Sequence, residues 1–163
     1  MSQTDVQVRD EAPFELACFE LRGALYALDV AQVLEIVHAP PVVSLPHAPH
    51  LIEGVVDLRG VVLPIVDLGR ALGEAPIDDP ARARVVVLQL DDLVFGLRVG
   101  AGSEVLSLPA AQVEAVPRLA TQAGYELVRA VVRRPGAEPV LVLSLEALLE
   151  RVYRSATQAE ATQ

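Results

Sequence analysis

Short aliphatic runs recur along most of the chain, and turns rich in glycine, proline or charged residues separate them. Runs of this length that alternate apolar with polar positions, or that consist of valine, leucine and isoleucine, indicate β-strands rather than helices. In the first half, the strands predicted by this pattern are 14–21, 24–30, 33–37, 51–58 and 61–68. In the second half, they are 84–90, 93–99, 103–108, 125–133 and 139–145.

The segments between these strands carry turn and loop signals. Arg22-Gly23 and Arg59-Gly60 each separate two strands and predict tight hairpin turns. The stretch 38–50 contains four prolines. It is therefore expected to be an ordered loop, because proline cannot donate a ladder hydrogen bond. The acidic, proline-containing stretch 73–83 predicts a linker.

Helical patterning is confined to two places. Residues 68–72 allow at most a very short helix, because a glycine follows them. Leucines and a valine at helical spacing predict a C-terminal helix over 145–156. The polar segments 1–13 and 156–163 are expected to be a flexible arm and a flexible tail.

The two halves of the chain resemble each other weakly. At one constant offset, Leu21, Tyr26, Leu28, Val30 and Glu35 fall on Leu90, Phe95, Leu97, Val99 and Glu104. The repeat units are approximately 14–75 and 84–144 within one domain over 14–155, and exchange of strands between them is left open. We expect a mostly β protein with two five-stranded, barrel-like subdomains, short helices and a C-terminal helix, since closing small sheets removes exposed edges.

The amino-acid composition argues against two classes of binding partner, nucleic acids and anionic membranes. The net charge is −9, and all 13 basic residues are arginines without a basic cluster. Nucleic acids and anionic membrane surfaces require concentrated positive charge, so neither is an expected partner. Cys18 is the single cysteine, and no apolar run is long enough to span a bilayer. These features predict a cytoplasmic protein without membrane insertion.

Few residues have catalytic or metal-binding potential. Asp57 and Asp67 end neighbouring strands and could form a carboxylate pair that shares a proton, but the residues after them lack the pattern of aspartic proteases. His47 and His50 lack further ligands at metal-site spacing. The sequence therefore favours a protein without enzymatic activity, cofactor or metal. A barrel that binds a small ligand or hydrolyses a substrate with Asp57 and Asp67 is the alternative.

Arg59 and Glu35 are charged residues in apolar surroundings. The guanidinium of Arg59, held at a turn by Gly60, could pair with a carboxylate on another chain, a solvated turn arginine being the alternative. Glu35 interrupts an apolar strand and is either a recognition residue or part of the solvent face of a half-buried strand.

Three stretches carry a family resemblance: FELRGALYALDVAQVLEIV, SLPHAPHLIEGVVDLRGVVLPIVDLGRALG and FGLRVGAGSEVLSL. Over residues 14–152 the chain resembles the CheW-like adaptor domain of bacterial chemosensory systems. The resemblance implies two five-stranded subdomains and no catalytic activity. It also implies that the protein couples the cytoplasmic tip of a methyl-accepting chemoreceptor to the regulatory domain of a CheA-type histidine kinase, within receptor arrays at the membrane.

The same resemblance implies receptor-binding positions around a groove between the subdomains, but it implies none for the kinase. They are Val30, Val33 and Glu35 on the groove-side stretch and Gly54, Asp57, Arg59 and Gly60 at the receptor-facing turn; through the internal repeat, Leu97 and Val99 would line the other side of the groove. Val33 would supply an apolar contact and Arg59 a charged contact. The two glycines would supply backbone freedom.

Two positions depart from the family pattern. Asp57 stands where the family has asparagine, and pairing of Asp57 with Arg59 would make the arginine less available. Residues 100–103 replace an acid and a valine, which predicts a more flexible loop. An accessory adaptor that binds only the receptor or only the kinase, in a motility or other chemosensory pathway, is therefore the second hypothesis.

Overall fold

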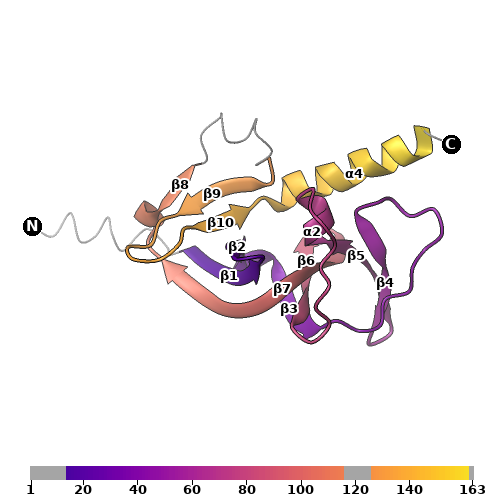
Figure 1. Cartoon of the computed structure of the whole chain (residues 1–163), viewed down its shortest axis with the longest axis horizontal. Helices are drawn as coiled ribbons and strands as arrows, with labels where there is room; N and C mark the ends of the chain where they lie inside the picture. The colour runs from indigo at the N-terminus through magenta and orange to yellow at the C-terminus, as the bar shows by residue number, and fades with distance from the viewer. Residues whose placement is uncertain (1–13, 116–125, 162–163) are drawn as a thin grey trace, which may run out of the picture.

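The computed structural model describes residues 14–115 and 126–161, and Figure 1 shows their path. Within those ranges it contains ten β-strands, two 3-10 helices and two α-helices. In chain order these are β1 Phe14–Leu21, β2 Ala24–Asp29, η1 Val30–Gln32, β3 Val33–His38, β4 Ile52–Leu58, β5 Val61–Asp67, α2 Leu68–Ala71, β6 Ala83–Leu90, β7 Leu93–Leu108, η2 Ala110–Gln112, β8 Val113–Ala115, β9 Val128–Val132, β10 Val140–Leu143 and α4 Leu145–Ala161.

The strands form two sheets that share β7, which curves from one sheet into the other in Figure 1. The first sheet, the β3–β6 subdomain, runs in the order β3, β6, β7, β5, β4. The second, the β8–β10 subdomain, runs in the order β7, β1, β2, β10, β9, β8. Neighbours are antiparallel except for β5 with β7 and β10 with β2. The prediction of a mostly β protein with two small β subdomains and a C-terminal helix is confirmed.

The expected break within residues 93–108 does not occur. The sequence predicted two strands joined by a flexible loop at 100–103, but β7 is one continuous strand. A side chain at Gly100 would place its Cβ 2.1 Å from the carbonyl oxygen of Glu20, so the glycine lets β1 and β7 pass close together. The glycine therefore serves close packing between strands, and the loop expectation is wrong.

Strand exchange, which the sequence left open, is seen for β1 and β2, which both lie in the second sheet. Residues of β2 belong to the first repeat unit but pair in parallel with β10 of the second, from Leu25 opposite Val140 to Ala27 opposite Val142. The sheets therefore do not follow the two halves of the sequence. Figure 1 shows β1 and β2 beside β10, away from β4 and β5.

The aliphatic core has three parts. One cluster lies within each subdomain, and the largest contains residues from both sheets and from α4. Strand β6 contributes to two of the clusters: Val85 and Val87 face the interior of the β3–β6 subdomain, while Val86 and Leu88 face the large shared cluster. Because both faces of β6 are buried, its sequence is a continuous apolar run rather than an alternating one.

Both predicted hairpin turns are confirmed. Arg22 and Gly23, and likewise Arg59 and Gly60, have positive φ at both central positions. This is the geometry of the tight turn that follows the twist of the flanking strands.

Two features of the second half differ from the prediction, namely the end of α4 and the strand β8. The predicted arm, 1–13, and Tyr125, the first residue of a predicted strand, lie outside the described residues. The helix α4 continues to Ala161, beyond the predicted end at 156, because residues 156–161 contain no glycine or proline. Strand β8 was not predicted, since it is short and mostly exposed.

Candidate partner-binding surface

The structure brings together Glu35 and Arg59, the two charged residues that the sequence singled out. Arg59 lies in the β4–β5 turn, and its Nη2 donates a hydrogen bond to Oε1 of Glu35 on β3. The Arg59 side chain is 70% exposed and that of Glu35 is 33% exposed. Because a guanidinium has five N–H donors, Arg59 can hold Glu35 and still offer donors to another carboxylate.

Asp57 shapes the turn that carries Arg59. Its Oδ1 accepts a hydrogen bond from the backbone N–H of Gly60 at 2.8 Å, so the carboxylate closes the turn. The sequence suggested that Asp57 could pair with Arg59. In the structure Asp57 instead binds the N–H of Gly60, and Arg59 pairs with Glu35. Gly60 has a φ of +85°, so its conformational freedom is used as expected.

Gly54 has a different role from the expected one. A Cβ at this position would lie 2.2 Å from the carbonyl oxygen of Val43. Val43 and Val55 exchange backbone hydrogen bonds of 2.9 Å, which attach the proline-rich loop to β4. Gly54 is therefore required for close packing of this loop, not for an unusual backbone angle.

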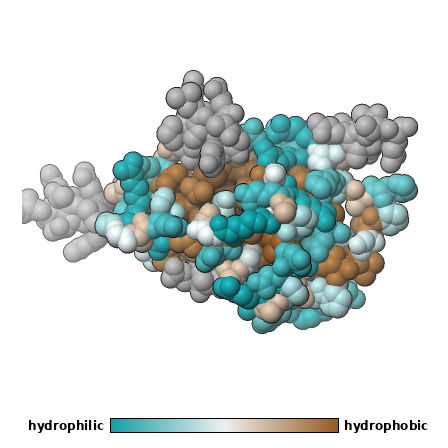
Figure 2. Space-filling model, in the orientation of Figure 1, coloured by the Kyte–Doolittle hydropathy of each residue, from teal (hydrophilic) through white to brown (hydrophobic). Residues whose placement is uncertain are grey.

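Large apolar side chains are exposed on the elements around the Glu35–Arg59 pair, and Ile36 lies on the opposite face of β3 from Glu35. We call this set the apolar patch, and it consists of Leu34, Ile36, Val43, Leu45, Val61 and Val62. Val43 and Val62 are 63% and 64% exposed. Figure 2 shows an apolar area at the edge of the molecule where Figure 1 places β4 and the loop before it. Large exposed apolar patches are typical of protein-binding surfaces.

Val30 and Val33 precede this region and are half-buried. Asp29 caps the 3-10 helix that contains Val30, accepting a hydrogen bond of 2.9 Å from the N–H of Ala31. Val33 packs against the shared core cluster and so fixes the start of β3. Val33 and Val30 lie two and five residues before Glu35, and both retain some exposed surface.

Leu97 and Val99 do not line a groove. Both are fully buried, and both belong to the shared core cluster between the subdomains. Leu97 is in register with Val86 of β6, which points into the same cluster. The repeat aligns Leu97 with Leu28 of β2, which is fully buried in the same cluster, so the alignment itself gives no reason to place Leu97 on a surface. Their role in this structure is to hold the subdomains together.

Asp57 and Asp67 do not form a catalytic pair. Asp57 lies opposite Val62 near the start of β5, whereas Asp67 ends β5. The five steps along the strand from Val62 to Asp67 span about 17 Å. Asp67 is buried and accepts hydrogen bonds from the N–H groups of Arg70, at 3.0 Å, and Ile77, at 3.2 Å. It caps α2, and the hypothesis of a shared proton is wrong.

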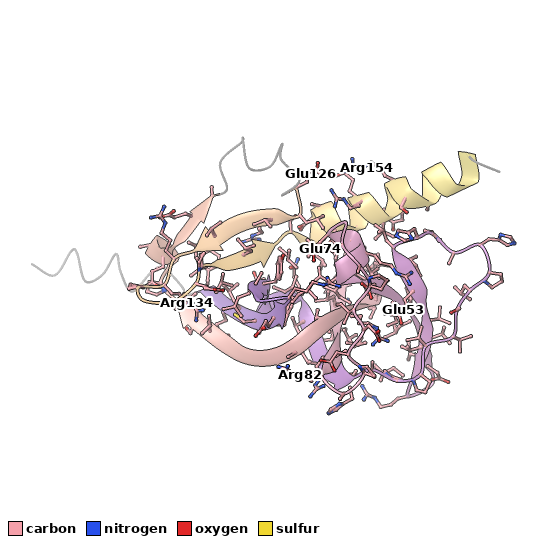
Figure 3. The ribbon with its side chains drawn as sticks, in the orientation of Figure 1. Glu53, Glu74, Arg82, Glu126, Arg134 and Arg154 are labelled. Carbon is pink, nitrogen blue, oxygen red and sulfur yellow. The ribbon has the colours of Figure 1, made fainter. Side chains whose placement is uncertain are left out.

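The sequence did not predict a charged pair inside the β3–β6 subdomain. Nε of Arg98 on β7 lies 2.6 Å from Oε2 of Glu53 on β4, and both side chains are mostly buried. The pair crosses over β5, which lies between these strands. An arginine within the apolar run of β7 was the available signal, but its partner depends on the strand order. Figure 3 labels Glu53 within this subdomain.

The described residues contain no group of three or more histidine, cysteine or carboxylate side chains placed to hold a metal ion.

None of the helices in the described ranges has the length and apolar character needed to cross a bilayer.

The fold and the surface together define a class of small β scaffolds. Two fused sheets present exposed apolar side chains and a charged pair, and Asp57 and Asp67 lie far apart. Comparison with known proteins gives the family. Residues 15–153 match the model of the CheW-like domain. The chain therefore belongs to the CheW-like family.

Individual relatives cover most of the chain. It is 31% identical over 147 residues to the probable chemotaxis protein CheW of Rhizobium etli, covering 90% of this chain and 91% of that protein. It is 32% identical over 145 residues to the chemotaxis protein CheW of Treponema pallidum, covering 86% and 84%. The crystal structure of the scaffolding protein TtCheW from Thermoanaerobacter tengcongensis is similar, with a TM-score of 0.76, 26% identity and coverage of 85% and 93%.

Proposed function

We propose that this protein is a cytoplasmic adaptor, without enzymatic activity, that couples the tip of a methyl-accepting chemoreceptor to a CheA-type histidine kinase in membrane receptor arrays. The observation that carries the proposal is the exposed Glu35–Arg59 pair beside the apolar patch. Membership of the CheW-like family, with relatives named as chemotaxis proteins and a scaffolding protein, supports it.

The chemistry of this surface suits binding of another protein. Desolvation of exposed aliphatic side chains supplies affinity, and a charged pair at the rim sets orientation and selects the partner. The side chains lie on a hairpin and an edge strand whose inner faces pack into the core, and on the loop that Val43 attaches to β4. A rigid surface loses little conformational freedom on binding. In an array, simultaneous contacts with several partners would add avidity to modest individual interfaces.

We assign the receptor contact to the end of the β3–β6 subdomain that contains Val30, Val33, Glu35 and Arg59. Asp57 and Gly60 shape the turn that presents Arg59. Gly54 contributes indirectly, by packing the loop that carries part of the apolar patch. Leu97 and Val99 are excluded from direct contact with a partner in this conformation, because they are fully buried.

The test is Arg59→Glu, with binding to a purified receptor cytoplasmic fragment and to the kinase regulatory domain measured separately. We expect receptor affinity to fall at least about tenfold, which is roughly 1.4 kcal/mol. The free energy of unfolding should change by less than about 1 kcal/mol, because the arginine is exposed. Arg133→Glu is the matched control: Arg133 is 77% exposed and pairs with Glu114 at 3.1 Å in the β8–β10 subdomain.

A charge-swapped double variant, Glu35→Arg with Arg59→Glu, separates a partner contact from an internal one. It restores an ion pair within the protein but reverses the charges offered to the receptor. We expect receptor binding to stay lost. Recovery in the double variant, or unchanged binding in Arg59→Glu, would contradict the assignment. Binding of the wild-type protein to only one of the two partners would favour the accessory adaptor.

A further inference from the structure

A second polar site lies where α2, α4 and the residues before β4 meet. It is a pocket of about 290 Å³. Its lining residues are Leu51, Arg70, Ala71, Gly73, Arg151, Arg154 and Ser155. Three of the 13 arginines therefore line one pocket of a chain whose net charge is −9. Neighbouring guanidiniums repel one another, so such a concentration requires negative groups to balance it.

Arg151 already has its negative partners. Its Nη1 donates a hydrogen bond of 2.6 Å to the carbonyl oxygen of Ala71, and its Nη2 pairs with Glu126. These contacts attach α4 to the end of α2 and to the residues before β9. The charge of Arg151 is therefore used within the protein, which leaves Arg70 and Arg154 in the pocket.

Arg154 is only weakly paired. Its Nη2 lies 3.8 Å from Oε1 of Glu150, one turn earlier on α4, and both side chains are more than 60% exposed. An exposed pair at this separation contributes about 0–1 kcal/mol and is readily exchanged for another partner. Figure 3 shows Arg154 at the same side of the molecule as Glu126.

Arg70 has no carboxylate partner in the described part of the chain. Its Nη1 donates to the carbonyl oxygen of His50 at 3.1 Å. Its Nε is buried and has no hydrogen-bond partner, and among the described residues it is the only buried side-chain nitrogen or oxygen in that state. Buried polar atoms without a partner are rare, and a half-buried guanidinium without a counter-ion is costly. This second observation shows that the Arg70 guanidinium retains hydrogen-bonding capacity that an anionic ligand could use.

We propose that this pocket binds a phosphate-class oxyanion, either free phosphate or the phosphate group of a small molecule. Arg70, Arg154 and Ser155 line the pocket, and guanidinium N–H and hydroxyl groups are the donors that a tetrahedral oxyanion accepts. A phosphate monoester carries a charge of about −1.5 to −2, which balances Arg70 and Arg154 better than a single carboxylate does. The bound anion would join α4, α2 and, through Arg70, the loop before β4. This site is separate from the partner surface and does not depend on its assignment.

The experiment is a titration of the full chain with inorganic phosphate, followed by thermal unfolding, with sodium chloride and sodium acetate at matched ionic strength. We expect phosphate to raise the unfolding temperature by a few degrees in a saturable way, because a ligand that binds only the folded state stabilises it. Chloride should give no saturable rise, and acetate a much smaller one. In 15N spectra, the Nε–H signal of Arg70 should shift along the same titration curve.

Arg154→Gln is the test variant, because its exposed side chain can be replaced without loss of folding. We expect it to abolish the phosphate-dependent rise and the Arg70 shift. Arg82→Gln makes the same change of charge at an exposed position that Figure 3 shows on the opposite side of the molecule, and it should respond like the wild type. Equal responses of wild type and Arg154→Gln, or of phosphate and chloride, would overturn the site. An equal response to acetate would overturn the assignment to phosphate.

Discussion

Gly54 and Gly60 stand in the same hairpin and are needed for different physical reasons. Gly60 occupies a left-handed backbone conformation with a φ of +85°, which L-residues with side chains rarely adopt. Gly54 has no such angle, but the space for its Cβ is taken by the carbonyl of Val43. A glycine in a sequence therefore does not reveal whether it serves a turn or a close approach until the neighbouring chain is known.

This distinction gives a prediction for Gly54→Ala. The added methyl group must displace the loop that carries Val43, so we expect a loss of about 1–3 kcal/mol in the free energy of unfolding. Denaturant unfolding measures that loss. Hydrogen exchange at the amides of Val43 and Val55, which pair with each other, should accelerate.

Gly23→Ala is the control for this change. Gly23 has a φ of +82°, but no atom lies within 4 Å of the position that a Cβ would occupy, so its strain is confined to the β1–β2 turn. It should destabilise the protein without exposing the amides of Val43 and Val55. Normal protection of these two amides in Gly54→Ala would show that the loop is held by something other than this contact.

At the scale of elements, the local signals were sufficient for most strands and for both hairpin turns. Runs of β-branched residues and an arginine-glycine pair encode these features over a few neighbouring positions. No local pattern shows which distant segments of the chain meet. Three features depend on that information: the continuity of β7, the exchange of strands between the sheets and the Glu35–Arg59 pair. The family resemblance, extended through the repeat, assigned Leu97 and Val99 to a surface, although both are buried.

The helix α4 packs one face against the shared core, and this face gives a second prediction. Leu148 is 1% exposed, so Leu148→Ala should cost about 2–5 kcal/mol in the free energy of unfolding by leaving a cavity. Glu150→Ala, on the exposed side of the same helix, should change it by less than about 0.5 kcal/mol. Chemical denaturation of both variants checks the contrast. Similar values for the two would mean that α4 is not part of the cooperative core.

For the whole molecule, the largest hydrophobic cluster lies between the subdomains rather than inside either one. It takes residues from both sheets and from α4, including Phe19 of β1, Leu88 of β6 and Leu145 of α4. Neither sheet can therefore lose its structure without exposing apolar surface of the other. The two subdomains resemble separate units in outline, but their stability is shared.

Shared stability predicts a single unfolding transition. In scanning calorimetry, the van't Hoff and calorimetric enthalpies should agree, as they do for one cooperative unit. Leu97→Ala, within the shared cluster, should lower the transition temperature without dividing the transition. Two resolved transitions, or a calorimetric enthalpy clearly above the van't Hoff value, would show that each subdomain folds on its own.

The shared strand also has a geometric consequence. Since β7 is a member of both sheets, one subdomain cannot slide along the other without breaking backbone hydrogen bonds with β6 or β1. Molecules attached to different subdomains are thus kept at one spacing and one relative angle. If many copies are joined through such attachments, the period of the resulting lattice is already set by the backbone of a single copy.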